Sequence, residues 1–133
     1  MIFGRSLGGV AAVHAASVRS AAGVILEATF SSLADASRVF FPILPVGLLL
    51  GGRMDSTAKI GRMRAPLLFI HGDADELIPI ALGRKLFEAA SLPKEFYTLR
   101  GAGHNDTYLV GGQAYSKKIR AFVDKATGGQ DAR

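Results

Sequence analysis

Residues 1–20 read MIFGRSLGGVAAVHAASVRS, and this stretch carries the strongest structural signal in the chain. Residues 1–4 are apolar and end on a glycine, as the last residues of a buried strand often do. From Ser6 to about Arg19 small and apolar residues lie nearly all round a helical wheel, which predicts a helix buried in the protein interior. Between the two elements, Gly4-Arg5-Ser6-Leu7-Gly8 matches G-x-S-x-G. This pattern at a strand-to-helix turn is typical of a serine nucleophile held in a strained backbone.

The helix that follows Ser6 offers a second part of the same chemistry. Its free N–H groups carry a partial positive charge, and the N–H of Leu7 could hold the oxyanion of a tetrahedral intermediate. An ordinary glycine-rich helix start, or a phosphate-binding loop, would fit the same residues. The G-K-[ST] and G-x-G-x-x-G patterns of the common nucleotide-binding loops are absent.

Strands and helices are predicted to alternate along the chain. Apolar runs bounded by turn residues predict further strands at residues 23–28, 67–70 and 94–99. Helical spacing and capping residues predict helices at 32–40, 55–60, 79–90 and 113–126, and residues 127–133 are expected to fray. Four strand–helix repeats indicate an α/β fold, with a parallel sheet of about four strands and helices on both faces.

Acidic residues follow the third predicted strand, in His71-Gly72-Asp73-Ala74-Asp75. Residues just beyond the carboxyl end of a parallel strand face the ligand crevice, so an acid there could orient a histidine. Asp73 and Asp75 both qualify, and we expect one of them to bond the backbone of its own turn. His71 sits at the end of the strand, which favours a structural role.

A histidine follows the fourth predicted strand, in Gly101-Ala102-Gly103-His104-Asn105-Asp106. A histidine pKa near 6.5 suits a general base at neutral pH, although a surface-loop histidine would fit the same position. Asp106 is expected to stabilise the loop or the start of a helix. His14, inside the first helix, is expected to be a packed or polar-face residue. No H-E-x-x-H pair is present, so no metal site is predicted.

Composition narrows the class of protein. The 133 residues are 49% hydrophobic and 20% charged, which fits one globular domain and excludes a disordered or collagen-like chain. The net charge of +5 is spread along the chain, so we expect a solvated surface and no nucleic-acid partner. The absence of cysteine excludes disulfides and a thiolate nucleophile and fits either redox compartment. A cytoplasmic location is favoured, and membrane association through a preceding segment stays open.

The most apolar stretch, VFFPILPVGLLLGG at residues 39–52, is too short to cross a membrane. Its 14 residues are interrupted by Pro42 and Pro45, whereas a spanning helix needs about 20 apolar residues. No transmembrane segment is therefore predicted within the chain.

Serine, acid and histidine, each just past a successive strand, follow the chain order of the α/β-hydrolase triad. Together with FGRSLGG (3–9), VILEATFSSL (24–33), LLFIHGDADELIP (67–79) and GAGHND (101–106), this order carries a family resemblance. The chain resembles the carboxyl-terminal half of an α/β-hydrolase-fold serine hydrolase. It is most similar to the alpha/beta hydrolase domain proteins and the serine aminopeptidase-like hydrolases.

The resemblance implies a role for each motif residue. It makes Ser6 the nucleophile, Asp75 the acid (the fifth residue of H-G-x-x-D), His104 the base and Leu7 the oxyanion donor. The implied reaction is hydrolysis of a small-molecule carboxylic ester or thioester through an acyl-enzyme, without a cofactor. A peptidase is an alternative that the sequence does not separate, because a fold does not choose its substrate.

The resemblance also places a cap-like insertion over the site, at about residues 30–54. Its apolar residues would then contact an acyl group, and the candidate substrate-binding residues are Phe30, Phe40, Phe41 and Leu44. Plain core packing would explain the same apolar residues.

One departure from the family pattern is large. The family has about five strands up to and including the one that precedes the serine, and this chain has only the end of the fifth. We therefore expect residues 1–126 to form a partial α/β-hydrolase domain whose amino-terminal half, with the second oxyanion donor, is missing. The competing hypothesis is a non-catalytic half that binds a complementary half, or a second copy, through its exposed sheet edge. Either way we expect the isolated chain to be marginally stable, prone to associate and nearly inactive.

Overall fold

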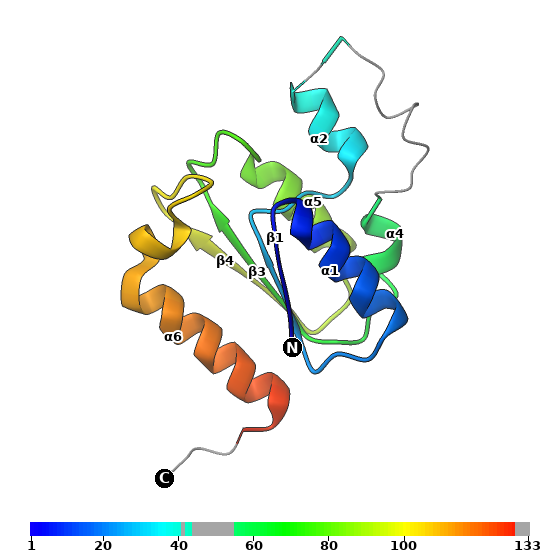
Figure 1. The fold of residues 1–133 in the computed structure, drawn as a ribbon, viewed down its shortest axis with the longest axis vertical. Helices are drawn as coiled ribbons and strands as arrows, with labels where there is room; N and C mark the ends of the chain where they lie inside the picture. The colour runs from blue at the N-terminus through cyan, green and yellow to red at the C-terminus, as the bar shows by residue number, and fades with distance from the viewer. Residues whose placement is uncertain (41, 44–54, 130–133) are drawn as a thin grey trace.

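A computed structural model describes residues 1–40, 42–43 and 55–129. Its centre is a parallel sheet of β1 (Ile2–Arg5), β2 (Val24–Glu27), β3 (Leu67–Gly72) and β4 (Lys94–Leu99), in the order β1-β2-β3-β4. Figure 1 shows the strands side by side, with their carboxyl ends toward the same end of the molecule. The predicted parallel α/β architecture is confirmed.

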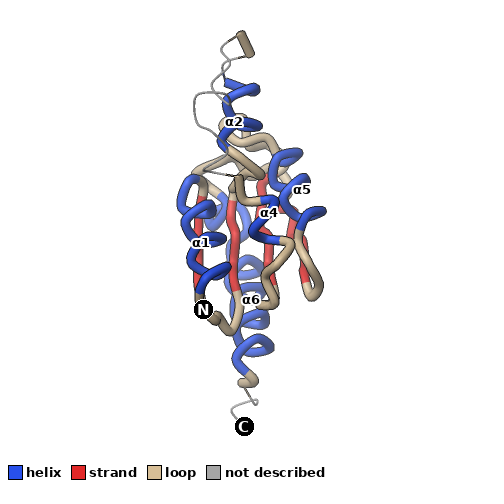
Figure 2. Tube along the Cα trace, turned by 90° about the vertical axis from the view of Figure 1, so that its right-hand side faces the viewer, coloured by secondary structure: helices blue, strands red, loops and turns tan. Residues whose placement is uncertain are grey.

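Helices cover both faces of this sheet. One face is covered by α1 (Leu7–Val18), α4 (Thr57–Ile60) and α5 (Ile80–Ala89), and the other by α6 (Thr107–Thr127), as Figure 2 shows. Alternate residues of β2 and β3 therefore enter two separate cores. Leu26 and Phe69 pack with α1, α4 and α5, while Ile25 and Leu68 pack with α6. Both strands are buried on both faces, which explains their continuous apolar runs.

Two differences from the predicted element boundaries bear on the site. β3 extends two residues past Ile70, so His71 and Gly72 belong to the strand. α6 begins at Thr107, well before the predicted start at residue 113, and is kinked at Gly112, whose φ is 51° and ψ −134°. The pair Gly111-Gly112 concealed the first turn of this helix. None of the helices in the described residues is long and apolar enough to cross a membrane.

The strand that precedes Ser6 lies at an edge of the sheet. Within the described residues β1 pairs with β2 alone, and the side chains of Phe3 and Leu7 are 51% and 54% exposed. α1 buries only the face that bears Gly9, Val10, Ala12 and Val13. Its apolar outer face is exposed in this chain, whereas the sequence pattern predicted burial all round.

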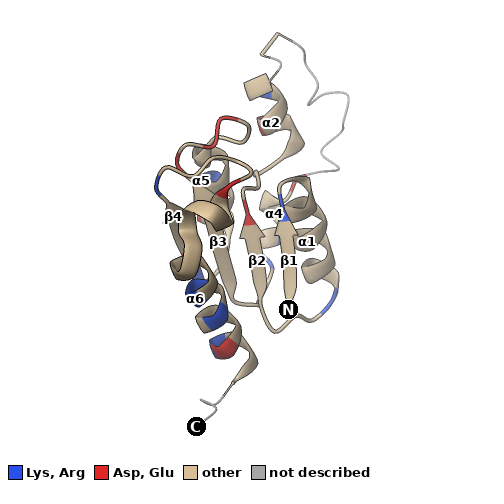
Figure 3. Ribbon diagram, turned by 60° about the vertical axis from the view of Figure 1, so that its left-hand side comes forward, with Lys and Arg blue, Asp and Glu red and all other residues tan. Residues whose placement is uncertain are grey.

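The segment predicted to be cap-like leaves and re-enters the core at one place. Ser32 and Asp55 form an isolated antiparallel bridge, and the N–H of Ser56 donates to the carbonyl of Ser31 at 2.9 Å. Between these points α2 (Leu33–Phe40) lies beyond the carboxyl ends of the strands, as Figure 3 shows. Phe41 and Leu44 lie outside the described residues.

We predict opposite outcomes for alanine at two adjacent glycines of α1. A Cβ at Gly9 would meet Thr29 Oγ1 at 2.2 Å, whereas a Cβ at Gly8 would meet nothing within 4 Å. Gly9→Ala should lower the free energy of unfolding by about 1–3 kcal/mol, as overpacking does. Gly8→Ala, the matched control, should leave it unchanged or raise it by about 0.5–1 kcal/mol. Urea unfolding measures both, and equal effects would contradict the packing described.

Candidate active site

The turn between β1 and α1 holds Ser6 in an unusual backbone conformation. Ser6 has φ 52° and ψ −124°, a region that L residues seldom adopt and that costs about 1–3 kcal/mol. Its N–H donates to the Glu27 carbonyl at 2.9 Å, and its carbonyl accepts from Thr29 Oγ1 at 2.8 Å. Gly9 lets Thr29 approach that closely. The strained turn predicted from G-x-S-x-G is present.

Backbone N–H groups of the loop after β3 hold the Asp75 carboxylate in place. One carboxylate oxygen, Oδ1, accepts from the N–H groups of Leu77 at 3.0 Å and Ile78 at 2.7 Å. The Asp75 side chain is fully buried, and its second oxygen, Oδ2, is turned toward His104. Two backbone hydrogen bonds, from Asp73 to Leu99 and from Ala74 to Ala102, join this loop to the loop after β4.

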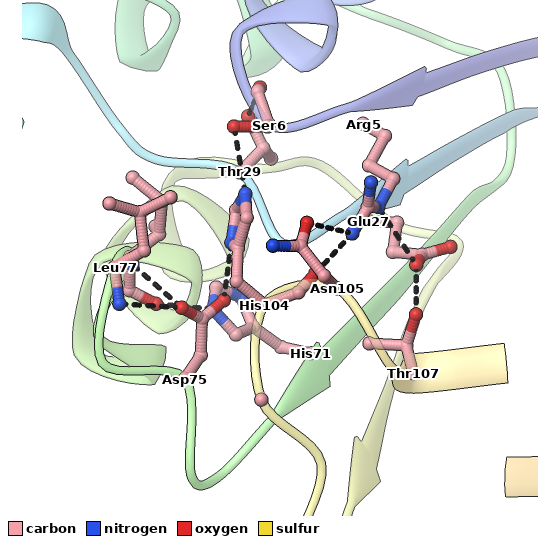
Figure 4. A network of polar contacts seen from close by, with 12 residues as sticks. Arg5, Ser6, Glu27, Thr29, His71, Asp75, Leu77, His104, Asn105 and Thr107 are labelled. Carbon is pink, nitrogen blue, oxygen red and sulfur yellow. Dashed lines mark hydrogen bonds and ion pairs between the residues drawn. The ribbon is translucent and has the colours of Figure 1, made fainter. Parts of the chain in front are cut away.

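His104 joins the acid to the serine. Its Nδ1 lies 2.8 Å from Asp75 Oδ2, and its Nε2 lies 3.2 Å from Ser6 Oγ (Figure 4). An ionised carboxylate only accepts hydrogen bonds, so Nδ1 carries the proton and Nε2 is left to accept from the Ser6 hydroxyl. The structure thus brings Ser6, His104 and Asp75, which are far apart in sequence, into one hydrogen-bonded chain.

The two aspartates that residue type alone left open, and of which the resemblance selected Asp75, have different partners in the structure. Asp75 contacts His104, whereas Asp73 accepts from the N–H of Gly101 at 2.7 Å and so fastens the two loops. Asp106 accepts from the N–H of Gly103 at 2.6 Å, in the loop-stabilising position expected of it. No group of three or more metal-ligating side chains occurs in the part of the chain that the structure describes.

His71 is a buried neighbour of the Asp75 carboxylate. It is buried, its Nε2 lies 2.8 Å from the Ile78 carbonyl, and the same nitrogen lies 3.5 Å from Asp75 Oδ2. The carbonyl accepts only, so Nε2 carries the proton. Burial lowers the pKa of His71 below its ordinary value of 6.5. This placement fits the structural role predicted for it.

The remaining predicted site residues, Leu7, Phe30 and Phe40, differ in how exposed their side chains are. The N–H of Leu7 is in the first turn of α1, where it has no intrahelical acceptor, and the Leu7 side chain is exposed. Phe30 packs in a core cluster with Val10 and Ile78, as the core-packing alternative expects. Phe40 is 39% exposed at the end of α2. Substrate contact at these positions stays a prediction.

Sequence reasoning missed a buried polar network beside the site. Glu27 is 2% exposed, and its carboxylate accepts from Thr107 Oγ1 at 2.5 Å and from the Tyr115 hydroxyl at 2.6 Å. Arg5 Nε lies 3.4 Å from the same carboxylate. Burial, together with the Glu27 carboxylate, raises the pKa of Tyr115. The overlooked signal was a single carboxylate inside the apolar run VILEA, since a buried charge requires partners.

Comparisons with known proteins identify relatives that are longer than this chain. An uncharacterized protein of Mycobacterium tuberculosis is 38% identical over 121 residues, which are 91% of this chain and 43% of the relative. Human alpha/beta hydrolase domain-containing protein 17B is 35% identical over 125 residues, 94% of this chain and 41% of the relative. The chain therefore spans less than half the length of either curated relative. No family model matches it.

Solved structures show the same fold. The esterase domain of a Rhodothermus marinus protein superposes with a TM-score of 0.68 at 24% identity, over 90% of this chain and 60% of that domain. At this identity the likeness establishes the fold, and it says nothing of the reaction.

We predict that His71 makes stability depend on pH. Its pKa is lowered in the folded protein, so the unfolded chain binds the proton more readily between the folded value and about 6.5. The free energy of unfolding should therefore fall as pH drops below about 6.5, and level off below the folded pKa. His71→Gln should flatten this fall in urea titrations between pH 7.5 and 5.0. His14→Gln, which removes an exposed histidine, is the matched control. A fall of the same size in both variants would contradict the assignment.

Proposed function

Because the chain is a homologue of alpha/beta hydrolase domain-containing proteins and has the α/β-hydrolase fold, we propose that it carries the catalytic triad of a serine hydrolase. Ser6 is the nucleophile, His104 the general base and Asp75 the orienting acid. The observation that carries the proposal is the hydrogen-bonded chain from Asp75 through His104 to Ser6, at 2.8 and 3.2 Å. The proposed substrates are carboxylic esters or thioesters, and no cofactor is required.

The geometry supports acylation with His104 as the carrier of the proton. His104 Nε2 takes the hydroxyl proton as Ser6 Oγ forms a bond to the carbonyl carbon, and the carbonyl oxygen becomes an oxyanion. His104, now positively charged, faces the buried Asp75 carboxylate, which stabilises that charge. The proton then passes to the departing alkoxide or thiolate, and the carbon–oxygen or carbon–sulfur bond breaks. The product is an acyl-Ser6 ester.

Deacylation repeats the same transfers with water. His104 takes a proton from a water molecule as the water oxygen attacks the acyl carbon. It then gives that proton to Ser6 Oγ as the ester bond breaks. The carboxylic acid leaves and the free enzyme is restored. Because Oδ1 of Asp75 is held by two backbone N–H groups, its Oδ2 stays directed at His104 through both half-reactions.

Leu7 supplies one donor for the oxyanion, from the first turn of α1. A single missing donor costs about 2.7–4 kcal/mol of transition-state stabilisation, so full activity requires a second. We expect this second donor from the part of the family fold that precedes the serine strand.

The cap-like segment is the proposed acyl-binding element. α2 lies beyond the carboxyl ends of the strands, at the end of the sheet where the triad is assembled (Figure 3). Its apolar side chains Val39 and Phe40 are 45% and 39% exposed, so they are free to contact an apolar acyl group.

A second candidate function is a half-domain that binds a complementary polypeptide. The observation that favours it is the outer edge of β1, which pairs with no strand among the described residues and is flanked by the exposed side chains of Phe3 and Leu7. A strand added there would pair with β1 and cover part of the apolar face. This candidate predicts a folded chain that self-associates and whose Ser6 is inert.

We predict that Ser6 reacts with a fluorophosphonate probe, which measures nucleophilicity without a full catalytic cycle. Ser6→Ala should abolish labelling, and His104→Ala should slow it by about 10³-fold or more, because the base is lost. Ser17→Ala, which removes another α1 serine, is the matched control and should label at the parental rate. Mass spectrometry locates the adduct. Equal labelling of Ser6→Ala would refute the nucleophile, and a Ser6 that stays inert in a polypeptide that also carries the amino-terminal half of the family fold would favour the second candidate.

We predict that the two aspartates of the loop after β3, Asp73 and Asp75, differ strongly in their effect. Asp75→Asn should slow the Ser6 reaction on the order of 10³–10⁴-fold, because an amide at this position favours the wrong histidine tautomer. Asp73→Asn removes a carboxylate from the same loop and should cost less than about tenfold, since Asp73 bonds a backbone N–H. Labelling rates compare the pair. The reverse ranking would transfer the role of the acid to Asp73.

A further inference from the structure

Arg5 spans the distance between a buried carboxylate and the loop that carries His104. We propose that Arg5 and Glu27 form a positioning pair that holds the backbone of His104 where its ring reaches both Asp75 and Ser6. The inference rests on the proposed function, and it assigns a role to the variable position between the glycine and the serine of G-x-S-x-G. Neither residue touches the hydroxyl or the imidazole, so both act through the histidine.

Glu27 is the fixed end of the pair. It ends β2, is 2% exposed and accepts hydrogen bonds from Thr107 and Tyr115 of α6. Because both donors are neutral, they do not balance the negative charge of the carboxylate. Arg5, whose Nε lies 3.4 Å from it, supplies the positive charge. A buried carboxylate with partners from two other elements has little freedom to move, so it fixes the plane of the guanidinium that faces it.

The other end of the guanidinium reaches the histidine loop. Arg5 Nη2 donates to the carbonyl oxygen of His104 itself, and also lies 3.2 Å from Asn105 Oδ1 (Figure 4). Because the guanidinium is planar and rigid, the position of Glu27 sets the position of the His104 peptide. A lysine could not reproduce this, since a single ammonium group cannot present two fixed directions.

The loop's other side-chain anchors on its backbone hold residues that precede His104. Asp73 fastens Gly101 and Asp106 fastens Gly103, and Gly101 has a φ of 76°. Among the described residues, Arg5 alone donates a hydrogen bond to the His104 carbonyl. Arg5 directly precedes Ser6, so the turn that places the nucleophile also places its base.

The test uses the full 133-residue chain and two readouts. The first is the proton NMR signal of His104 Nδ1–H, which reports the contact with Asp75 and needs no activity. The second is the rate of Ser6 labelling by a fluorophosphonate. Arg5→Met keeps the aliphatic stem and removes the guanidinium, and Glu27→Gln removes the charge that orients it. Lys118→Met is the matched control, because it removes the cation of a different ion pair, with Glu95 on β4.

We expect Arg5→Met and Glu27→Gln to shift or broaden the His104 signal and to slow labelling by about 10–100-fold, as misplacement of reacting groups does. Arg5→Lys should recover little of the rate, whereas Lys118→Met should match the parent. Arg5→Met leaves the buried Glu27 carboxylate without its cation, so its melting midpoint should fall below that of Lys118→Met, which breaks an exposed pair. Both readouts are therefore taken well below the two midpoints, where both variants are folded, which separates positioning from general stability.

An unchanged His104 signal with parental labelling in Arg5→Met would overturn the inference, as would equal losses in Lys118→Met. Failure of the proposed function gives a different result. In that case the parent shows no labelling that depends on Ser6, and the NMR comparison alone still decides whether Arg5 holds His104.

Discussion

The peptide on either side of Ser6 is held by hydrogen bonds to the strand next to it. Its N–H is bound to Glu27 and its carbonyl to Thr29, so both halves of a strained turn are fastened to β2 and the residues that follow it. Gly9 makes this possible, because any larger residue would push Thr29 away. The cost of the backbone conformation, about 1–3 kcal/mol, is thus met by contacts that form only when β1, β2 and α1 are packed together.

Parallel pairing then assembles the rest of the site. Arg5 lies opposite Glu27, Glu27 opposite Ile70, and Gly72 opposite Leu99. The loops after β1, β3 and β4 therefore all emerge at the carboxyl ends of the strands, at the same end of the sheet. Two layers of polar contacts result. Asp75, His104 and Ser6 form the layer proposed to perform chemistry. Glu27, Arg5 and the His104 backbone form a layer that supports it.

The sequence predicted the parts of the structure that depend on local pattern and chain order. The apolar runs predicted β2 and β3. The chain order serine, acid, histidine pointed to three residues that are hydrogen-bonded to one another in the structure. The sequence did not predict contacts that depend on distant elements. Residue chemistry alone did not choose between Asp73 and Asp75, and only the family resemblance selected Asp75. In the structure Asp75 contacts His104, whereas Asp73 accepts from the Gly101 N–H. Likewise the sequence did not predict the start of α6, because the pair Gly111-Gly112 resembles a loop. In the structure Glu27, on a distant strand, accepts hydrogen bonds from Thr107 and Tyr115 of this helix.

The bridge between Ser32 and Asp55 has a consequence for how such proteins diverge. Because the chain leaves the core and returns to it at neighbouring residues, the length between them can change while the distance between β2 and α4 stays the same. The entropic cost of a longer loop grows only with the logarithm of its length. Insertions and deletions there therefore have a small entropic cost, so the length and composition of this segment can change while the strained turn and its partners are inherited intact.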